Sequence, residues 1–353
     1  MKILFTFHLG TGGIVTLNLQ RFQALQSKEF DCHFLYLTGG AGIKNMKGAK
    51  TFITNDDEKI LEILEREQYD LVVVILDYLF VLRLRRLGYN GKLIYDIQGF
   101  GTEINNLLEL AKKHIIGHVE GIMFPRTPHL QNLVDFHFPS IQKFSFHNCI
   151  NTTSFTYLQL PKPQKTIIGW VGRIEPNKNW KLFLQLGAEL IRDNQSIELW
   201  MFEDPTTADK LERIRFKKWL EKLNLKKHLL SHYNISYDKM PEYYSMIGES
   251  GGFLCSTSKK EGFGYAVIEA MSCNCPVLCT DSDGIKSFVH HNKTGKIMPR
   301  DDLQTMVLEA KELLYNEDLR NRLRKEAFLY VNKNFNPLVY KENFINMLTT
   351  LGL

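Results

Sequence analysis

The chain has 353 residues, of which 44% are hydrophobic, 12% aromatic and 24% charged. This is the composition of an ordinary globular protein, and it excludes fibrous, collagen-like and disordered chains. The 44 basic and 39 acidic residues leave a net charge of +5, too small a surplus to indicate a nucleic acid partner. The charge is compatible with an acidic ligand such as a phosphate, or with weak peripheral contact to an anionic membrane.

Apolar runs in the sequence are short, and none approaches the roughly 20 residues that a membrane-spanning helix needs. The apolar start at 1–9 soon meets glycines, which predicts a first β-strand rather than a signal peptide. We therefore expect a cytoplasmic protein, with association at the inner face of the membrane left open. Its six cysteines are expected to be free thiols. Zinc at Cys273, Cys275 and Cys279 is the weaker alternative, because their spacing does not fit the usual zinc patterns.

The first half of the chain alternates apolar runs with helical patterns. Strands are predicted at 3–9, 33–37, 71–76 and 93–97, and helices at 14–27, 58–68 and 80–87. Strands that alternate with helices indicate a parallel sheet covered on both faces. The helix at 80–87 carries Arg83, Arg85 and Arg86, for which a solvated helix face is preferred over a membrane-binding face, because the helix has only about two turns.

The same pattern restarts in the second half. Strands are predicted at 166–171, 197–202, 252–255 and 277–279, and helices at 178–192, 208–223, 241–247 and 266–273. A polar link with two prolines at 159–164 separates the two patterns. The sequence therefore predicts an α/β protein with two doubly wound domains, residues 1–158 and 159–336, followed by a helix at 337–353.

Three loops that follow predicted strands carry residues suited to phosphates or sugars. Gly12 and Gly13 lie between a strand and a helix, where backbone N–H groups can approach an anion, although a purely structural turn is the alternative. Arg173 leaves a strand and Lys178 is expected to begin the next helix with Asn177 as its N-cap. Two cations at that edge suit a diphosphate, but taken alone they would be interpreted as surface residues.

The third loop combines carboxylates with a glycine turn. Glu261 precedes Gly262-Phe263-Gly264, whose backbone N–H groups can face a phosphate, and Glu269 lies about one turn into the following helix. Carboxylates in these places can accept hydrogen bonds from sugar hydroxyls. The alternative for Glu269 is a helix acid that only interacts with the helix dipole, worth a few tenths of a kcal/mol, roughly.

Glu261 and Glu269, separated by seven residues, resemble the E-x7-E signature of the retaining glycosyltransferases of family 4 (glycosyl transferases group 1), which have the GT-B fold. Gly172-Arg173 followed by Lys178 is similar to the diphosphate motif of that family, and Gly12-Gly13 to its N-terminal glycine loop. The resemblance runs from the first strand to about residue 295.

This resemblance implies two Rossmann-like domains that face one another across a cleft, with the last helix crossing back to the first domain. It implies that Arg173 and Lys178 neutralise a nucleotide diphosphate and that Glu269 holds the ribose. The donor sugar is assigned to Glu261 and to the following segment, which consists of Gly262, Phe263, Gly264 and Tyr265. Gly12 and Gly13 are assigned to the phosphates or the acceptor. The candidate catalytic residues are Arg173, Lys178 and Glu261.

Two positions bear on the acceptor and on metals. Gln98 stands where many relatives have a histidine, so it can form hydrogen bonds but cannot become a cation, and it is a candidate acceptor or sugar contact. Asp281-Ser282-Asp283 matches a metal motif of a different transferase fold, but solvated turn carboxylates are the preferred interpretation. The resemblance implies no essential metal and no other cofactor.

The sequence predicts a retaining hexosyltransferase that moves a sugar from a nucleotide diphosphate sugar, expected to be a UDP-sugar, to a hydroxyl group. The acceptor is a glycan, a lipid or a small molecule, and the expected role is cell-surface glycan or glycoconjugate synthesis. Two alternatives stay open. One is a nucleotide-sugar epimerase or hydrolase on the same fold, and the other is a non-catalytic GT-B partner protein.

Overall fold

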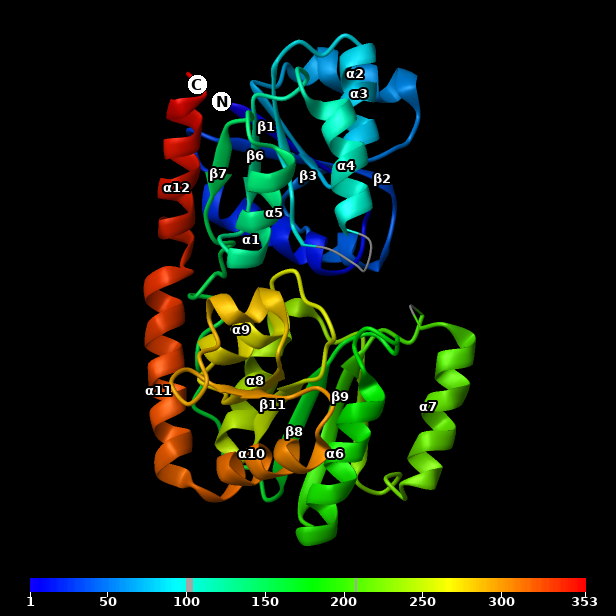
Figure 1. Cartoon of the computed structure of the whole chain (residues 1–353), viewed down its shortest axis with the longest axis vertical. Coiled ribbons are helices and arrows are strands. Elements are labelled where there is room, and N and C mark those ends of the chain that lie inside the picture. The colour runs from blue at the N-terminus through cyan, green and yellow to red at the C-terminus, as the bar shows by residue number, and fades with distance from the viewer. Residues whose placement is uncertain (100–103, 207) are drawn as a thin grey trace. The chain divides into compact units, whose positions relative to one another are not determined.

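The computed structural model describes residues 1–99, 104–206 and 208–353. The chain divides into two compact units, of which the first comprises Met1–Asn151 with Phe335–Leu353 and the second Thr152–Asn334. The predicted boundaries lie at 158/159 and 336/337, a few residues after those of the structure. Each unit contains one parallel β-sheet with helices on its faces, so the predicted α/β class with two Rossmann-like units is confirmed (Figure 1).

The sheet of the first unit has the strand order β3-β2-β1-β4-β5-β6-β7, and the strand pairs are parallel. Its strands are β1 (Lys2–Leu9), β2 (Asp31–Thr38), β3 (Lys50–Ile53), β4 (Leu71–Ile75), β5 (Lys92–Asp96), β6 (Gly121–Phe124) and β7 (Lys143–Ser145). Its helices are α1 (Gly13–Leu25), α2 (Asp57–Glu67), α3 (Tyr78–Arg86), α4 (Ile104–Ile115), α5 (Pro128–His137) and α12 (Pro337–Thr350), with a short 3-10 helix η1 (Ala41–Asn45). The order changes direction between β1 and β4, which is the topological switch point of this sheet.

Local sequence explains these elements. The five residues of β4, Leu-Val-Val-Val-Ile, are all buried, as expected for a central parallel strand covered on both faces. Helix α2 begins after Asp56, whose side chain accepts a hydrogen bond from the Lys59 backbone N–H. Helix α12 packs on α1, and the Arg21 side chain donates a 2.9 Å hydrogen bond to the Tyr340 hydroxyl. The last helix is therefore part of the first unit.

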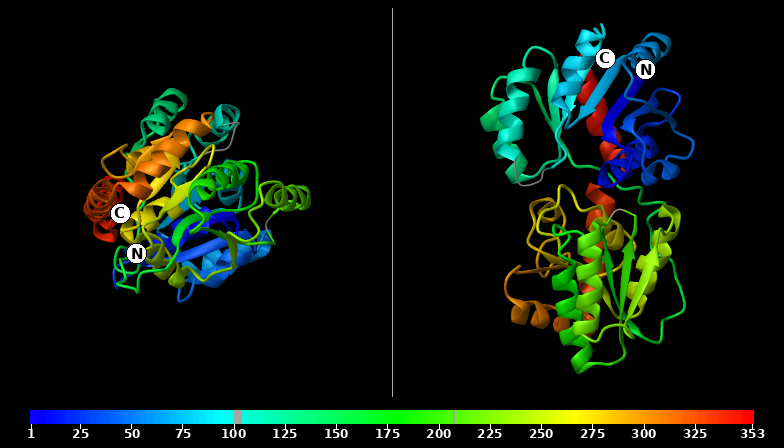
Figure 2. Two further views of the ribbon diagram at one scale, coloured as in Figure 1. Left: turned by 90° about the horizontal axis from the view of Figure 1, so that it is seen from below. Right: turned by 90° about the vertical axis from the view of Figure 1, so that its right-hand side faces the viewer.

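The second unit has a six-stranded parallel sheet of order β10-β9-β8-β11-β12-β13. Its strands are β8 (Thr166–Val171), β9 (Ile197–Glu203), β10 (Leu229–Tyr233), β11 (Phe253–Ser256), β12 (Val277–Thr280) and β13 (Lys296–Met298). Its helices are α6 (Trp180–Asp193), α7 (Lys210–Lys222), α8 (Met240–Glu249), α9 (Tyr265–Ser272), α10 (Leu303–Tyr315) and α11 (Glu317–Asn334), with 3-10 helices η2 (Tyr237–Lys239) and η3 (Asp283–Ser287). The right-hand view in Figure 2 shows these strands side by side with helices on both faces. The switch point lies between β8 and β11.

The predicted strands and helices are confirmed in type, and their ends lie within three residues of the observed ends. The structure adds β3, β6, β7, β10 and β13, each of three to five residues. It also adds α4, α5, α10 and α11. Helices α10 and α11 are separated by Asn316 alone, so their patterns run together in the sequence.

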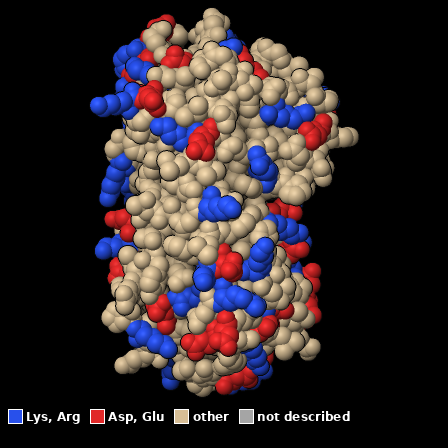
Figure 3. Space-filling view, turned by 90° about the vertical axis from the view of Figure 1, so that its left-hand side faces the viewer, with Lys and Arg blue, Asp and Glu red and all other residues tan. Residues whose placement is uncertain are grey.

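Two of the three arginines of α3, Arg83 and Arg85, are less solvated than the sequence predicts. Arg83 donates to Asp57 and Asn55, and Arg85 donates to three backbone carbonyl groups, whereas Arg86 is the well-exposed member. On the molecular face drawn in Figure 3, basic and acidic residues are interspersed rather than gathered by sign. Over the described parts of the chain, no helix has both the length and the apolar character that crossing a membrane would require.

Candidate functional site

The loops after β8 and β11 lie at the switch point of the second sheet and are joined by hydrogen bonds. The Thr257 hydroxyl accepts a 3.0 Å bond from the Trp170 indole N–H and donates a 2.8 Å bond to the Lys178 carbonyl. The Lys259 backbone N–H donates to the Asn177 carbonyl at 2.8 Å. Ligands of open α/β sheets bind at the carboxyl ends of the strands beside such a switch point. Hydrogen bonds therefore join the two loops that carry the predicted motifs into one edge.

Lys178 and Glu261 face each other at this edge. The Lys178 ammonium nitrogen lies 2.5 Å from Glu261 Oε1, and the Ser258 hydroxyl donates to the same oxygen at 2.6 Å. Both charged side chains are partly accessible, with exposed fractions of 23% for Lys178 and 15% for Glu261. An ammonium group has three protons and a carboxylate has a second oxygen, so both groups retain capacity for a ligand.

The predicted start of the helix after β8 is wrong. Helix α6 begins at Trp180, after Asn179, which has the left-handed φ of 49° and forms no side-chain cap. Asn177 is not an N-cap, since its side-chain amide donates to the Lys260 carbonyl at 3.1 Å. Lys178 thus stays in the loop, from which its ammonium group reaches Glu261.

Arg173 is paired within its own loop, and its predicted contact with a diphosphate stays a prediction. Its guanidinium lies 3.1 Å from the Glu175 carboxylate and is 48% exposed. The structure therefore brings Lys178 and Glu261 together, whereas Arg173 is paired two residues along its own loop. Neither Glu175 nor Ser258 was predicted as a site residue, although both lie within three residues of a predicted one.

The glycine turn before α9 has the backbone that the motif predicts. Gly264 has a φ of 92° and immediately precedes Tyr265, the first residue of the helix. The first N–H groups of a helix have no intrahelical partners and favour anions. Phe263 is buried, with its ring 5.0 Å from that of Tyr265, so its backbone rather than its side chain can face a ligand.

The backbone of η3 approaches the loop before this turn so closely that Gly284 has no room for a side chain. The Gly284 backbone N–H donates a 3.0 Å bond to the Glu261 carbonyl. A Cβ at Gly284 would lie 2.6 Å from backbone atoms of Glu261 and Gly262. The sequence did not indicate this contact, because it joins loops that follow different strands.

Glu269 is buried rather than solvated, with an exposed fraction of 5%. Its two carboxylate oxygens accept hydrogen bonds from the hydroxyl groups of Tyr237 at 3.0 Å and Tyr244 at 2.9 Å. Burial raises the pKa of Glu269 to about 7, and the two phenol hydrogen bonds oppose this rise. A helix acid that only interacts with the helix dipole would have neither property.

The glycine turn of the first unit is open. Gly12 has a φ of 77°, a conformation that favours glycine, and it precedes α1. A Cβ on Gly12 or Gly13 would meet no atom within 4 Å, so packing does not explain the two small residues. This leaves their predicted role toward phosphates or the acceptor as a prediction.

Gln98 belongs to a buried network of the first unit. Its side-chain amide donates to Asp96 at 2.6 Å and accepts from the Asn148 amide at 2.7 Å, and its exposed fraction is 6%. Asp96 is completely buried and forms a 2.7 Å ion pair with Arg21. The amide of Gln98 is therefore fixed at both ends, and its contact with an acceptor stays a prediction.

The residues considered as metal ligands from the sequence are an aspartate paired with a lysine and a set of buried free thiols. Asp281 lies 2.7 Å from the Lys286 ammonium group. The six cysteines are free thiols and all are buried. Among residues 1–99, 104–206 and 208–353, no three His, Cys, Asp or Glu side chains are grouped as metal ligands.

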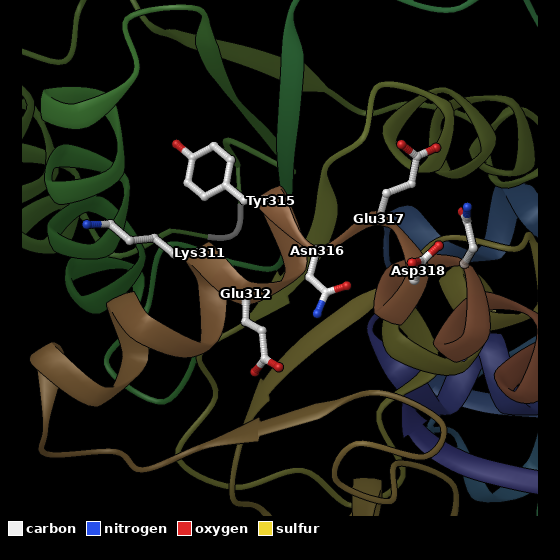
Figure 4. A pocket seen from close by; sticks show the side chains of 7 residues that line it. Lys311, Glu312, Tyr315, Asn316, Glu317 and Asp318 are labelled. Carbon is white, nitrogen blue, oxygen red and sulfur yellow. The ribbon is translucent and has the colours of Figure 1, made fainter.

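A cavity of about 650 Å³ opens at the junction of α10 and α11 (Figure 4). Its lining includes Lys311, which pairs with Asp193, and Glu312, which lies 2.5 Å from the buried ammonium group of Lys296. The residues of the predicted site do not line it. We assign the candidate site to the edge formed by β8 and β11.

Comparisons with known proteins agree with the two-unit fold. The family model of glycosyl transferases group 1 matches residues 158–329. The poly(ribitol-phosphate) alpha-N-acetylglucosaminyltransferase of Staphylococcus aureus is 22% identical over 59% of this chain and 41% of its own length. A second relative, from Campylobacter jejuni, is 27% identical over 44% of this chain and 40% of its own length. It is named as an N-acetylgalactosamine-N,N'-diacetylbacillosaminyl-diphospho-undecaprenol 4-alpha-N-acetylgalactosaminyltransferase.

The matched part of the chain thus spans about two fifths of the length of these curated relatives. Among solved structures, HepE of Anabaena in complex with UDP and glucose superimposes with a TM-score of 0.81 at 13% identity. That match covers 99% of this chain and 100% of the other. At this identity the likeness shows the fold, which is GT-B with its two Rossmann-like units.

Proposed function

We propose that the chain is a retaining glycosyltransferase that moves a sugar from a nucleotide diphosphate sugar, a UDP-sugar, to an acceptor hydroxyl group. The observation that carries this proposal is the contact between Lys178 and Glu261 at the switch point of the second sheet. The turn at Gly264 and the start of α9 follow directly in the chain. A cation, a carboxylate and a helix N-terminus at one edge are the groups that a diphosphate and its sugar require.

The leaving diphosphate is the first chemical requirement. When the bond to the sugar breaks, negative charge develops on the diphosphate, and donors that already point at it lower the barrier. We assign this task to Lys178, to Arg173 and to the backbone N–H groups at the start of α9. The exposed guanidinium of Arg173 can turn from Glu175 toward a more highly charged phosphate. Because these groups supply positive charge, we expect no metal or other cofactor to be essential.

The two glutamates suit different hydroxyl groups. Glu261 is accessible and shares its Oε1 with Lys178 and Ser258, so its Oε2 is available to the donor sugar next to the diphosphate. The backbone of Gly262, Phe263 and Gly264, together with Tyr265, borders the same ligand. Glu269, one turn into α9, is assigned to the ribose. This division follows the order in which the donor presents its sugar, diphosphate and nucleoside.

The names of the relatives support the class of reaction and of acceptor. Both describe the transfer of an alpha-linked amino sugar, one to poly(ribitol-phosphate) and one to a diphospho-undecaprenol-linked sugar. We therefore propose a glycan or lipid-linked glycan acceptor, bound mainly by the first unit, and a role in cell-surface glycan synthesis. Gly12, Gly13 and Gln98 are the candidate contacts there.

The donor can be identified before the acceptor is known. Thermal unfolding is measured with saturating UDP-glucose, UDP-N-acetylglucosamine, GDP-mannose and ADP-glucose. A ligand at one hundred times its Kd stabilises the folded state by about 2.7 kcal/mol, so binding gives a clear shift. Turnover of the best donor is then followed with and without oligosaccharide acceptors.

A matched pair of variants gives the control. Glu261→Gln should lose turnover. Glu221→Gln should not, since Glu221 is an exposed residue on α7 that pairs with Lys226. The proposal is contradicted if no nucleotide sugar stabilises the protein. Turnover at the same rate with and without acceptor would instead support a nucleotide-sugar hydrolase.

A further inference from the structure

We infer that Tyr237 and Tyr244 are positioning residues of the nucleotide site, because their phenols hold the Glu269 carboxylate ready to accept the hydroxyl groups of a ribose. The inference rests on the proposed function, in which Glu269 binds the donor through that ribose. It adds two residues from outside the E-x7-E motif, on η2 and on α8, that no comparison assigns.

The geometry leaves one orientation for this carboxylate. Tyr237 donates to Oε1 and Tyr244 donates to Oε2, so each oxygen has its own phenol. An ionised carboxylate only accepts hydrogen bonds, which means that both phenols must act as donors. Each oxygen can accept more than one bond, and a second acceptor position on each oxygen matches the two neighbouring hydroxyl groups of a ribose.

The two phenols stabilise the ionised form of Glu269. Glu269 is buried, and removal from water disfavours its ionised form and raises its pKa to about 7. Among the described residues, the titratable groups that interact with it are the two phenols and the thiol of Cys273, which follows α9. Burial raises the pKa of all three, so they stay uncharged near neutral pH. The phenols therefore act on Glu269 as hydrogen-bond donors. Loss of one would leave more of the carboxyl group protonated at neutral pH.

The tyrosines are themselves held in place. Tyr244 is fully buried in α8. The Tyr237 ring lies 4.7 Å from the ring of Phe155, and the Phe155 carbonyl accepts a 2.5 Å bond from the hydroxyl of Ser272 at the end of α9. The first residues of the second unit thus fix Tyr237 against the helix that carries Glu269. A rigid arrangement of this kind is what a preorganised binding carboxylate requires.

The experiment compares nucleotide affinity between variants across pH. Calorimetry with UDP, and with GDP and ADP in parallel, is carried out from pH 6.5 to pH 8.5 on the wild type, Tyr237→Phe and Tyr244→Phe. The control is Tyr243→Phe, since Tyr243 is the neighbour of Tyr244 on α8 and packs on Trp200 and Phe202 instead. Titration of the nucleotide itself is common to all variants and cancels in the comparison.

We expect Tyr237→Phe and Tyr244→Phe to bind roughly ten- to a hundredfold more weakly near pH 7, the range for a lost hydrogen bond to a charged group. Affinity should return toward the wild-type value as the pH rises, because the carboxyl group then ionises without the phenol. Glu269→Gln should also weaken binding. Because its side chain does not titrate, its affinity should not recover as the pH rises. Tyr243→Phe should match the wild type throughout.

Each of the following results would overturn the inference. Wild-type affinity in both phenol variants would show that the hydrogen bonds do not serve binding. An equal loss at every pH would indicate a merely structural role. If the wild type binds none of the three nucleotides, the proposed function fails and the inference fails with it; binding that is lost in Lys178→Ala but intact in the phenol variants refutes the inference alone.

Discussion

In the first unit, the edge at the carboxyl ends of the strands carries an open glycine turn after β1 and, after β5, an amide fixed by a buried network. At the switch point of the second sheet, by contrast, accessible charges face one another. In the first unit Arg21 and Asp96 are buried and form an ion pair with each other. In the second unit Lys178 and Glu261 form a pair that solvent and a ligand can reach. The same topology thus holds a structural ion pair in one unit and a candidate binding pair in the other.

The difference teaches how to separate charges that support the fold from charges that support binding. A buried ion pair has already lost its water, so removal of one partner leaves the other uncompensated. A partly exposed pair contributes little to stability because solvent screens it. Variants of the two pairs should therefore change different observables, stability for the first and activity for the second.

The largest expected effect is on stability in the first unit. Arg21→Met should destabilise this unit by about 3–5 kcal/mol, since it leaves the buried Asp96 without its cation. Burial raises the pKa of Asp96 and Arg21 opposes that rise, so the lone carboxyl group should take up a proton and soften the loss. The measurement is denaturant unfolding with a probe in each unit, because two units need not unfold together.

Lys178→Met is the matched variant and should leave the unfolding midpoints nearly unchanged. Equal destabilisation by both variants would remove the distinction between the two pairs.

Activity should depend on the pair of Lys178 and Glu261 in the second unit rather than on the buried pair of the first. Lys178→Ala should lower kcat/KM by about 30- to 1000-fold, equal to about 2–4 kcal/mol of transition-state stabilisation. Arg173→Ala should cost less, because Arg173 is paired with Glu175 and must turn to reach a phosphate. Lys181→Ala, a neighbouring lysine on α6 whose ammonium group lies over the Trp180 ring, is the control and should retain activity.

A greater loss for Arg173→Ala than for Lys178→Ala would contradict this ranking. It would mean that the donor rebuilds the site around Arg173 rather than around the pair that the structure shows.

Much of this site could be predicted from sequence because its motifs are local. Lys178, Glu261 and the turn at Gly264 lie in short segments where residue type and spacing carry the chemistry. The start of α6 could not be placed, since Asn177 and Asn179 are both capping residues by type, and the structure uses the left-handed conformation at Asn179. The fold class could be predicted for the same reason, because each strand and each helix shows its own short-range pattern of apolar residues.

The partners of these residues could not be predicted. Tyr237 and Tyr244 lie 32 and 25 positions from Glu269 in the chain, so only the folded sheet brings them together. Gly284 approaches Glu261 from the loop after a different strand. Spacing in a sequence gives no measure of such contacts, because they depend on how helices and loops pack over the sheet edge.

The buried carboxyl group of the second unit predicts a pH effect on stability. The folded pKa of Glu269, about 7, lies above its ordinary value of 4.5, so between these values the folded state binds more protons than the unfolded state. Stability from this group is therefore complete below about pH 4.5 and is lost as the pH rises through 7. The loss should be at most about 3 kcal/mol.

The measurement is the unfolding midpoint of the second unit from pH 5 to pH 8, compared with Glu269→Gln, in which this contribution is absent. A difference between the two proteins that stays constant with pH would show that Glu269 does not titrate in this range.

The smallest expected effect concerns Ser258, whose hydroxyl group donates to the oxygen of Glu261 that also contacts Lys178. Ser258→Ala should leave the ion pair in place but free the carboxylate to rotate, so it should lower kcat by about three- to tenfold, as expected for about 1 kcal/mol from one hydrogen bond. The affinity for UDP alone should not change, since under the proposed division Ser258 acts through the carboxylate assigned to the sugar and not through the diphosphate. Ser258→Thr, which keeps the hydroxyl group, should restore turnover. If Ser258→Ala weakens UDP binding as much as turnover, Glu261 contributes to the nucleotide and not to the sugar, and the division between the two glutamates would have to be reversed.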